Sequence, residues 1–159
     1  MLRHFAIAAV LSLLACPISA QNEPATAINS AKPADYSQEG MVVEQYITRV
    51  SFESDGSGVR EVTAVARAQS EAGVQQMAVL TFPYTSGSET LDVDYVRVRK
   101  ADGSVVVTPA YNIQDMPADV TRIAPMYSDI HEKHITVKAL GVGDTLEYLI
   151  RFHIKPEIP

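Results

Sequence analysis

Residues 91–109 (LDVDYVRVRKADGSVVVTP) constrain the fold more than any other part of the chain. Apolar and polar residues alternate over the first nine positions, with the period of two that is typical of a half-buried β-strand. The alternation slips by one residue near Tyr95 and Val96, which predicts a β-bulge. Asp102 and Gly103 then predict a tight turn, and the β-branched run that follows predicts the returning strand. The segment therefore predicts a β-hairpin.

The first 20 residues have the pattern of an export signal. Arg3 and His4 form a short basic start, an apolar run follows, and Ala20 supplies the small residue that signal peptidase requires. The run is about 11 residues long, and a helix that spans a bilayer needs roughly 20. We therefore expect a signal peptide over residues 1–20, cleavage after Ala20, a periplasmic or secreted domain, and no transmembrane segment after cleavage.

Cys16 leaves a second mode of export open. Residues 13–16 (LLAC) resemble the lipobox of bacterial lipoproteins, in which the cysteine is lipidated and becomes the new N-terminus. Under that alternative the mature domain is lipid-anchored through Cys16. Because Cys16 is the chain's single cysteine, neither alternative provides a disulfide framework or a free thiol nucleophile.

The charge balance argues against nucleic acid as a partner. The 159 residues carry 13 basic and 19 acidic side chains, for a formal net charge of −6. The basic residues are scattered, and their densest group is Arg97, Arg99 and Lys100, whereas a nucleic-acid surface needs a basic stripe. We interpret this group as the solvated face of a strand.

Composition divides the remainder into a tether and one domain. Residues 21–40 hold two prolines and few large apolar side chains, so we expect a flexible linker. Residues 41–159 form the expected domain, in which strands are predicted at 41–52, 59–68 and 146–154.

Two further segments of this domain are interpreted from local signals. Residues 77–82 (MAVLTF) predict a strand that is buried on both faces and ended by Pro83. Residues 116–126 contain two prolines and no clear period, so they predict a long irregular connection and a candidate interaction loop.

No chemical motif stands out from the polar residues. His131 and His134 have carboxylates beside them, but a spacing of three points their side chains to opposite faces of a strand, which disfavours a shared metal. A local combination of Ser128, Asp129 and His131 is weak support for a hydrolase, because catalytic groups usually converge from distant segments. We expect no cofactor and no metal site.

The order of these elements resembles a known family. ESDGSG at 53–58, FPY at 82–84, VRVRKADGSVV at 96–106, YSD at 127–129 and LGVGDTLEY at 140–148 follow one another as in the domain of unknown function that precedes transglutaminase-like domains in exported bacterial proteins. The resemblance implies an all-β fold. It also implies that the Cys-His-Asp catalytic domain would follow this chain, which then corresponds to a fragment without catalytic residues of its own.

Patterning and resemblance together predict an all-β fold, a two-layer antiparallel β-sandwich of about seven to nine strands. The expected function is a non-catalytic extracytoplasmic accessory domain that packs against or positions a transglutaminase- or peptidase-like domain, in cis or in trans. The alternative is a free-standing secreted module that binds glycan or peptide. Its expected ligand or interaction surface consists of Tyr84, Tyr111, Met116, Met126 and Tyr127.

Overall fold

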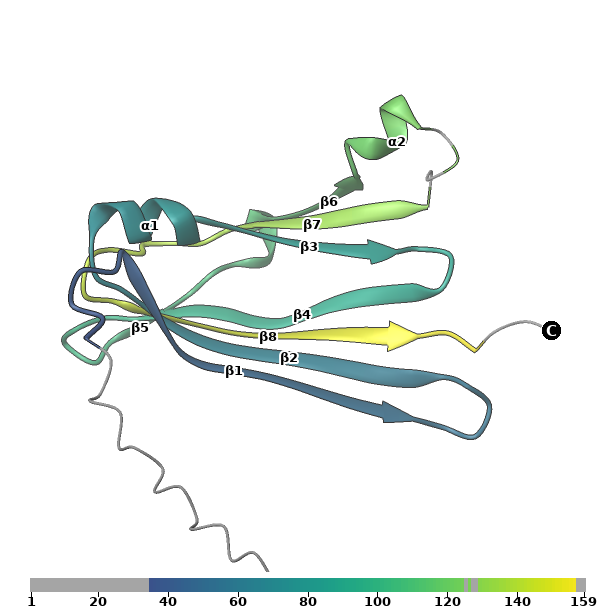
Figure 1. Cartoon of the computed structure of the whole chain (residues 1–159), viewed down its shortest axis with the longest axis horizontal. Helices are drawn as coiled ribbons and strands as arrows, with labels where there is room; N and C mark the ends of the chain where they lie inside the picture. The colour runs from purple at the N-terminus through teal and green to yellow at the C-terminus, as the bar shows by residue number, and fades with distance from the viewer. Residues whose placement is uncertain (1–34, 125, 127–128, 157–159) are drawn as a thin grey trace, which may run out of the picture. The chain divides into compact units, whose positions relative to one another are not determined.

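The computed structural model describes residues 35–156 except Pro125, Tyr127 and Ser128. Within these residues the chain forms eight strands, two short α-helices and one 3-10 turn (Figure 1). In order they are β1 (Met41–Phe52), β2 (Gly58–Ala68), α1 (Glu71–Met77), β3 (Val79–Thr85), β4 (Glu89–Arg99), β5 (Val105–Val107), η1 (Ala110–Asn112), β6 (Ile113–Pro117), α2 (Val120–Ile123), β7 (Ile130–Thr136) and β8 (Thr145–Ile154).

The strands form two antiparallel sheets that lie as two layers (Figure 1). The larger sheet has the order β1-β2-β8-β4-β5, and the smaller has the order β3-β7-β6. Ile135 of β7 and Leu146 and Ile150 of β8 belong to one buried apolar cluster, so the two sheets share a core. The prediction of a two-layer antiparallel β-sandwich is confirmed, and its eight strands fall within the expected range.

The hairpin that was predicted over residues 91–109 is formed by β4 and β5. The register of β4 shifts between Val93 and Tyr95, so the bulge lies close to the position that the slipped alternation indicates. Gly103 has a φ of 84°, which is the left-handed conformation that the turn requires and that glycine adopts without strain.

The last strand occupies the centre of the larger sheet. β8 pairs with β2 on one side and with β4 on the other, and its alternate residues Leu146, Ile150 and Phe152 are 3% exposed or less. The strict alternation of this segment in the sequence therefore reflects a strand whose one face is buried in the core.

The prediction for residues 77–82 was wrong in three respects. Met77 ends α1, and β3 starts only at Val79. The side chains of β3 alternate between exposed and half-buried, because one face of the strand contacts the core and the other faces solvent. Pro83 lies within β3 and does not end it, which is tolerated because β3 is an edge strand of the smaller sheet.

The irregular connection over residues 116–126 is also corrected in part. It contains the end of β6 and the four residues of α2, which projects from the smaller sheet (Figure 1). A helix of four residues is too short to leave a periodic pattern, so the sequence gives no signal for it.

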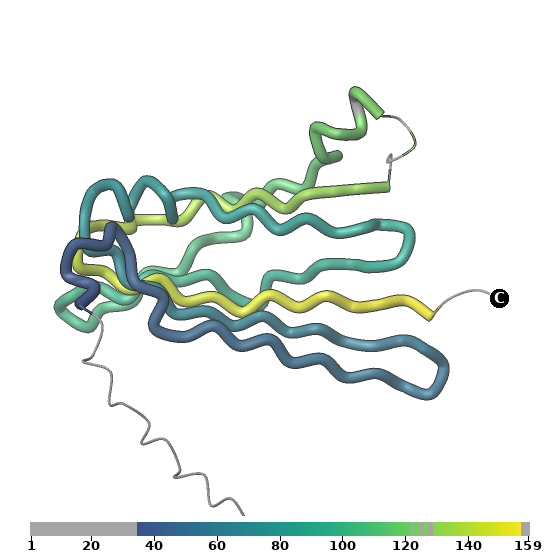
Figure 2. Tube along the Cα trace, in the orientation of Figure 1, coloured from purple at the N-terminus to yellow at the C-terminus, as the bar shows by residue number. Residues whose placement is uncertain are grey.

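Helix α1 carries the chain from the larger to the smaller sheet at one end of the sandwich (Figure 2). Ser70 caps its start, with the side-chain oxygen accepting a hydrogen bond from the Gly73 N–H. The Gly40 carbonyl, directly before β1, accepts hydrogen bonds from the N–H groups of Gln69 and Ser70 at 2.8 and 3.1 Å. These contacts attach the start of β1 to the start of α1.

Candidate functional site

A row of large apolar side chains along β1 lies on the core-facing side of the larger sheet but remains exposed. Val43, Tyr46, Val50 and Phe52 are 52%, 62%, 49% and 66% exposed, and we call them the β1 row. Directly paired residues of antiparallel strands point to the same face. Tyr46 pairs with the buried Ala64, so the β1 row continues the face of the sheet that forms the core.

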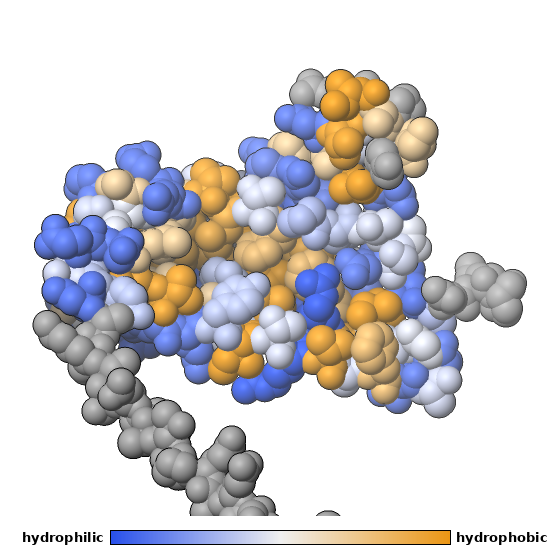
Figure 3. Space-filling view, in the orientation of Figure 1, coloured by the Kyte–Doolittle hydropathy of each residue, from blue (hydrophilic) through white to orange (hydrophobic). Residues whose placement is uncertain are grey.

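The row stays exposed because the two sheets differ in width. The larger sheet has five strands and the smaller has three, so β1 extends past the cover that β3, β7 and β6 provide. Apolar side chains are visible between the two layers on this side of the molecule (Figure 3). An uncovered apolar strip of this kind is typical of a contact surface.

A groove of about 230 Å³ runs beside the β1 row. Its floor includes Ala64 and Ala66 of β2, whose small side chains leave the space, and one wall is formed by Met77 of α1 and Leu80 of β3. The remaining lining residues are Met41, Val43, Tyr46, Gln76, Leu146 and Tyr148. A groove with this lining can accept apolar side chains of another protein segment.

A polar cluster occupies the core-facing side of the smaller sheet, centred on Asp115. The Tyr84 hydroxyl donates to Asp115 Oδ2 at 2.7 Å, and Lys133 Nζ lies 2.9 Å from the same oxygen. His131 Nδ1 is 3.3 Å from Asp115 Oδ1. Register places all four on the face that carries Ile135, because Tyr84 pairs with His131 and Asp115 pairs with Lys133.

Burial and hydrogen bonding set the charge states of this cluster. Desolvation and the adjacent Asp115 carboxylate raise the pKa of Tyr84 to about 12, so its hydroxyl stays protonated at neutral pH. Desolvation opposes ionisation of Asp115, but hydrogen bonds from Lys133, Tyr84 and His131 outweigh it and lower its pKa. Each charge in the cluster therefore has an internal partner.

The structure separates most of the residues that the sequence suggested as a ligand surface. Tyr111 is 79% exposed in η1, and the neighbouring Asn112 side chain donates to the Thr136 carbonyl. Tyr84 pairs with His131, five residues along β7, which corresponds to roughly 17 Å. The two tyrosines therefore do not meet in one concavity.

Met116 and Met126, two of the other suggested residues, lie on the far side of β6 or beyond it. Met116 is 37% exposed and follows Asp115 directly, so it points to the opposite face of the smaller sheet from Tyr84. Met126 is 82% exposed, near α2. Tyr127 lies outside the described residues.

The two histidines lie on opposite faces of β7. His131 contacts Asp115 on the core-facing side, whereas His134 Nε2 is 2.7 Å from Glu132 Oε2 on the outer side. Within the described part of the chain no three metal-ligating side chains converge on one point. Ser128, which a local serine and histidine combination would need, lies outside that part.

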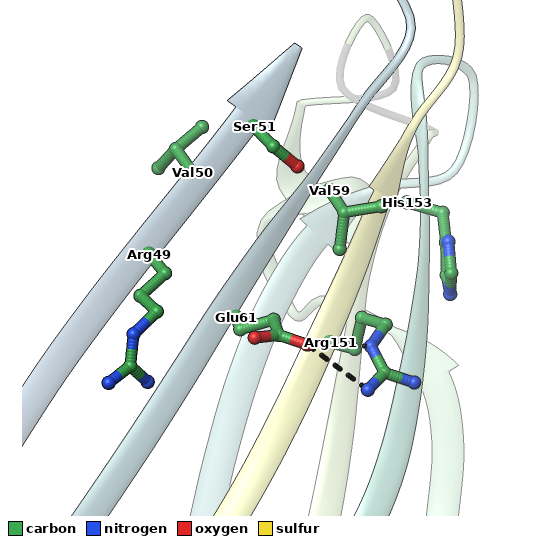
Figure 4. Close-up of a pocket in the computed structure, with 7 residues that line it drawn as sticks. All are labelled: Arg49, Val50, Ser51, Val59, Glu61, Arg151 and His153. Carbon is green, nitrogen blue, oxygen red and sulfur yellow. Dashed lines mark hydrogen bonds and ion pairs between the residues drawn. The ribbon is translucent and has the colours of Figure 1, made fainter. Parts of the chain in front are cut away.

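The outer face of the larger sheet carries a cross-strand ladder of charges. Arg151 of β8 pairs with Glu61 of β2 at 3.1 Å and with Asp94 of β4 at 2.8 Å. Figure 4 shows Arg49 of β1 beside this ladder, with His153 on β8 further along the same open surface. The ladder contains charges of both signs and does not form a single-sign binding surface.

The basic group at the end of β4 lies at the surface, with 40% of the Arg97 side chain and 56% of the Arg99 side chain exposed, and it also forms ion pairs. Arg97 Nε is 2.7 Å from Glu147, whose side chain is only 7% exposed, and Arg99 pairs with the same carboxylate. Lys100 pairs with the buried Asp144. The sequence could not reveal these pairs because both carboxylates lie more than 40 residues away along the chain.

Sequence reasoning missed the β1 row. The segment was predicted as a strand from its valines and aromatic residues, but nothing local shows whether a second layer covers it. The one available signal is that residues 41–52 carry more large apolar side chains than a strand with one buried face needs.

Fold and surface define a β-sandwich domain with one uncovered apolar face. Residues 54–158, more than half of the chain, match a family that is described as a domain of unknown function with a solved structure, DUF3857. The chain belongs to this family, which confirms the resemblance that the sequence motifs indicate. None of the helices in the described residues is long and apolar enough to cross a membrane.

Among solved structures, the chain is similar to a proposed protease from Parabacteroides distasonis, with a TM-score of 0.70 and 18% sequence identity. The match covers 74% of this chain and 24% of that protein, so this chain spans about a quarter of the length of its structural neighbour. At this identity the likeness shows the fold alone. A search of curated proteins found no match.

Proposed function

We propose that this protein is a non-catalytic accessory domain that acts outside the cytoplasm, where it packs against and positions a transglutaminase- or peptidase-like domain. That domain would follow in the same polypeptide or be provided by another chain. The leader at residues 1–20, with cleavage after Ala20 or lipidation at Cys16, supports export.

The observation that carries the proposal is the β1 row with its adjacent groove. Four large apolar side chains, each about half exposed or more, form a strip that a domain working alone would be expected to cover. The strip reaches the end of the sandwich at which the chain leaves β8, since Phe52 pairs with Gly58 and Gly58 pairs with Ile154. A domain that follows β8 would therefore emerge close to Phe52.

Two further observations support this assignment. The match to the solved neighbour covers only a quarter of that protein, as expected for one domain of a larger protein. The polar cluster around Asp115 holds its charges in internal pairs, and its tyrosine stays protonated, which supports a structural role for these groups. The alternative ligand-binding module gains no support from the separated tyrosines.

The first test is the coding sequence past residue 159. An open frame that encodes a transglutaminase-like Cys, His and Asp set is the expected result, and a stop codon directly after Pro159 would contradict the arrangement in one polypeptide. Hydrogen exchange then compares this chain with the longer one. Both chains are compared at a dilution at which they are monomeric, and we expect the amides of β1 to exchange more slowly in the longer chain.

Matched variants of the longer chain localise the contact. Tyr46→Asp should restore fast exchange in β1, because it places a charge in the middle of the β1 row. Val107→Asp is the control, since Val107 is also exposed, at 59%, but lies on β5 at the opposite edge of the same sheet. Equal protection of β1 in the two variants would show that the following domain docks elsewhere.

A further inference from the structure

The four edge strands of the two sheets differ in how they are protected against pairing with another chain. Exposed strand edges offer unpaired N–H and C=O groups, and proteins usually block them with proline, lysine, short length or bulges. β3 contains Pro83, β6 ends at Pro117, and β5 has only three residues. β1 has 12 residues, no proline and no lysine. Its single irregularity is the bulge at Glu44.

The open edge of β1, which is interrupted by the bulge at Glu44 alone, is also the edge beside the exposed β1 row. β2 pairs with one side of β1, and no strand of the described residues pairs with the other. A long apolar edge of this kind would aggregate unless something specific occupies it. The sequence of β1 indicates what that occupant is.

We propose that β1 pairs antiparallel with β1 of a second copy of this chain, around a two-fold axis at Ile47. When Glu44 is counted as the additional residue of the bulge, Ile47 is the midpoint of the strand. In this register every residue of the strand except Glu44 is paired, and each faces one whose side chain lies on the same side of the sheet. Such a dimer joins the two larger sheets into one continuous sheet.

The side chains of β1 match each other in this register. On the core-facing side Val50 would face Val43, Phe52 would face Met41 and Tyr46 would face Thr48, so the apolar rows of the two copies join. On the outer side Ile47 would face itself, and Arg49 would face Gln45, with Glu44 directly beside it. No β-branched or aromatic residue of the row would face a charge.

Charge complementarity on the outer side supports a second copy over an unrelated strand. Arg49 has no ion pair with any carboxylate of the described residues, and Glu61 opposite it is engaged by Arg151 (Figure 4). Glu44 lies 3.0 Å from Arg67 with 41% of its side chain exposed, so it can accept a second cation. The two-fold axis would bring Arg49 of each copy to Glu44 of the other, which forms two equivalent ion pairs.

Sedimentation and light scattering of the purified full chain test the proposal. We expect the mass to double with increasing protein concentration. Arg49→Glu should weaken dimerisation by at least about tenfold, because it places two acidic side chains together twice in one interface. Lys138→Glu is the matched control, since it makes the same change of charge at an exposed position after β7 and should dimerise like the wild type.

A charge exchange separates loss of pairing from loss of folding. Glu44→Arg alone should weaken dimerisation to a similar extent, whereas a mixture of the Glu44→Arg and Arg49→Glu chains should form heterodimers. In the heterodimer the arginine introduced at position 44 of one chain meets the glutamate introduced at position 49 of the other, and the native Arg49 still meets the native Glu44.

Circular dichroism of each variant checks that it is folded. A wild-type chain that stays monomeric at its highest soluble concentration would overturn the proposal. A dimer that is unaffected by Arg49→Glu, or a mixture without heterodimers, would do so as well.

Discussion

Replacing Gly73 with alanine has two effects of opposite sign on the stability of the fold. Gly73 lies in α1, where alanine is intrinsically preferred over glycine by about 1 kcal/mol. A methyl group at this position, however, would overlap the Gly40 carbonyl oxygen and lie 2.5 Å from the Gly40 carbonyl carbon. Both contacts involve backbone, so no side chain can turn aside to relieve them.

The steric clash with Gly40 outweighs the helix preference of alanine. Inserting a methyl group into a tight contact costs about 1–3 kcal/mol. Gly40 also accepts two hydrogen bonds from the segment before α1, each worth about 0.5–1.5 kcal/mol, and moving Gly40 away would weaken both. After subtraction of the helix preference, we expect Gly73→Ala to lower the free energy of unfolding by about 1–5 kcal/mol.

Urea unfolding followed by circular dichroism measures this change, which suits a chain that contains no tryptophan. Gln75→Ala is the control, because Gln75 is exposed on the same helix and its replacement should change the stability by less than about 0.5 kcal/mol. A Gly73→Ala chain as stable as the wild type, or more stable, would show that the contact between Gly40 and α1 does not hold the start of β1 in place.

Three further predictions concern other parts of the sandwich. Glu147→Gln should lower the free energy of unfolding by about 1.5–3 kcal/mol in urea, because two arginines lose their charged acceptor. Glu44→Gln removes an exposed ion pair and should lower the free energy of unfolding by about 1 kcal/mol or less. Equal losses in the two variants would show that the ion pairs of the buried Glu147 stabilise the fold no more than the exposed pair of Glu44 does. The pKa of Tyr84 is raised to about 12, above its unfolded value near 10, so its contribution to stability is full below pH 10 and is lost as the pH rises toward 12. The stability difference between the wild type and Tyr84→Phe should therefore shrink between about pH 10 and about pH 12, and a constant difference would contradict the raised pKa. Ala139 has a φ of 57° and is the non-glycine residue with positive φ in the described chain. Ala139→Gly should therefore raise the free energy of unfolding by about 0.5–1 kcal/mol, as measured by thermal unfolding. A lower stability of the variant would show that the loop does not strain alanine.

Only part of the candidate site could be predicted from the sequence. Export, the accessory role and the absence of a catalytic set of residues are predictions from the leader and from the family motifs. The sequence pointed to exposed aromatic residues as a surface, and Tyr111 is indeed exposed, but Tyr84 is engaged by Asp115 inside the polar cluster. The β1 row was not predicted, because exposure depends on whether a distant strand covers the residue.

The sequence by itself determined the local conformation of most strands. Strict alternation placed β8 with one buried face, the slipped alternation located the bulge of β4, and Asp102-Gly103 located the turn of the hairpin. These features follow from the period of two in a strand and from the backbone freedom of glycine. Both are properties of a few neighbouring residues.

Only the tertiary structure decided how the strands are shared between the two sheets, and hence which apolar face remains uncovered. β3 joins β7, about 50 residues further along the chain, and leaves the five-stranded sheet two strands wider than its cover. The pairing of Arg97 with Glu147 and the contact of Gly40 with Gly73 arise in the same way, from residues that meet only after folding. A strand's periodicity shows which side chains share a face, but the packing of distant segments determines what that face contacts.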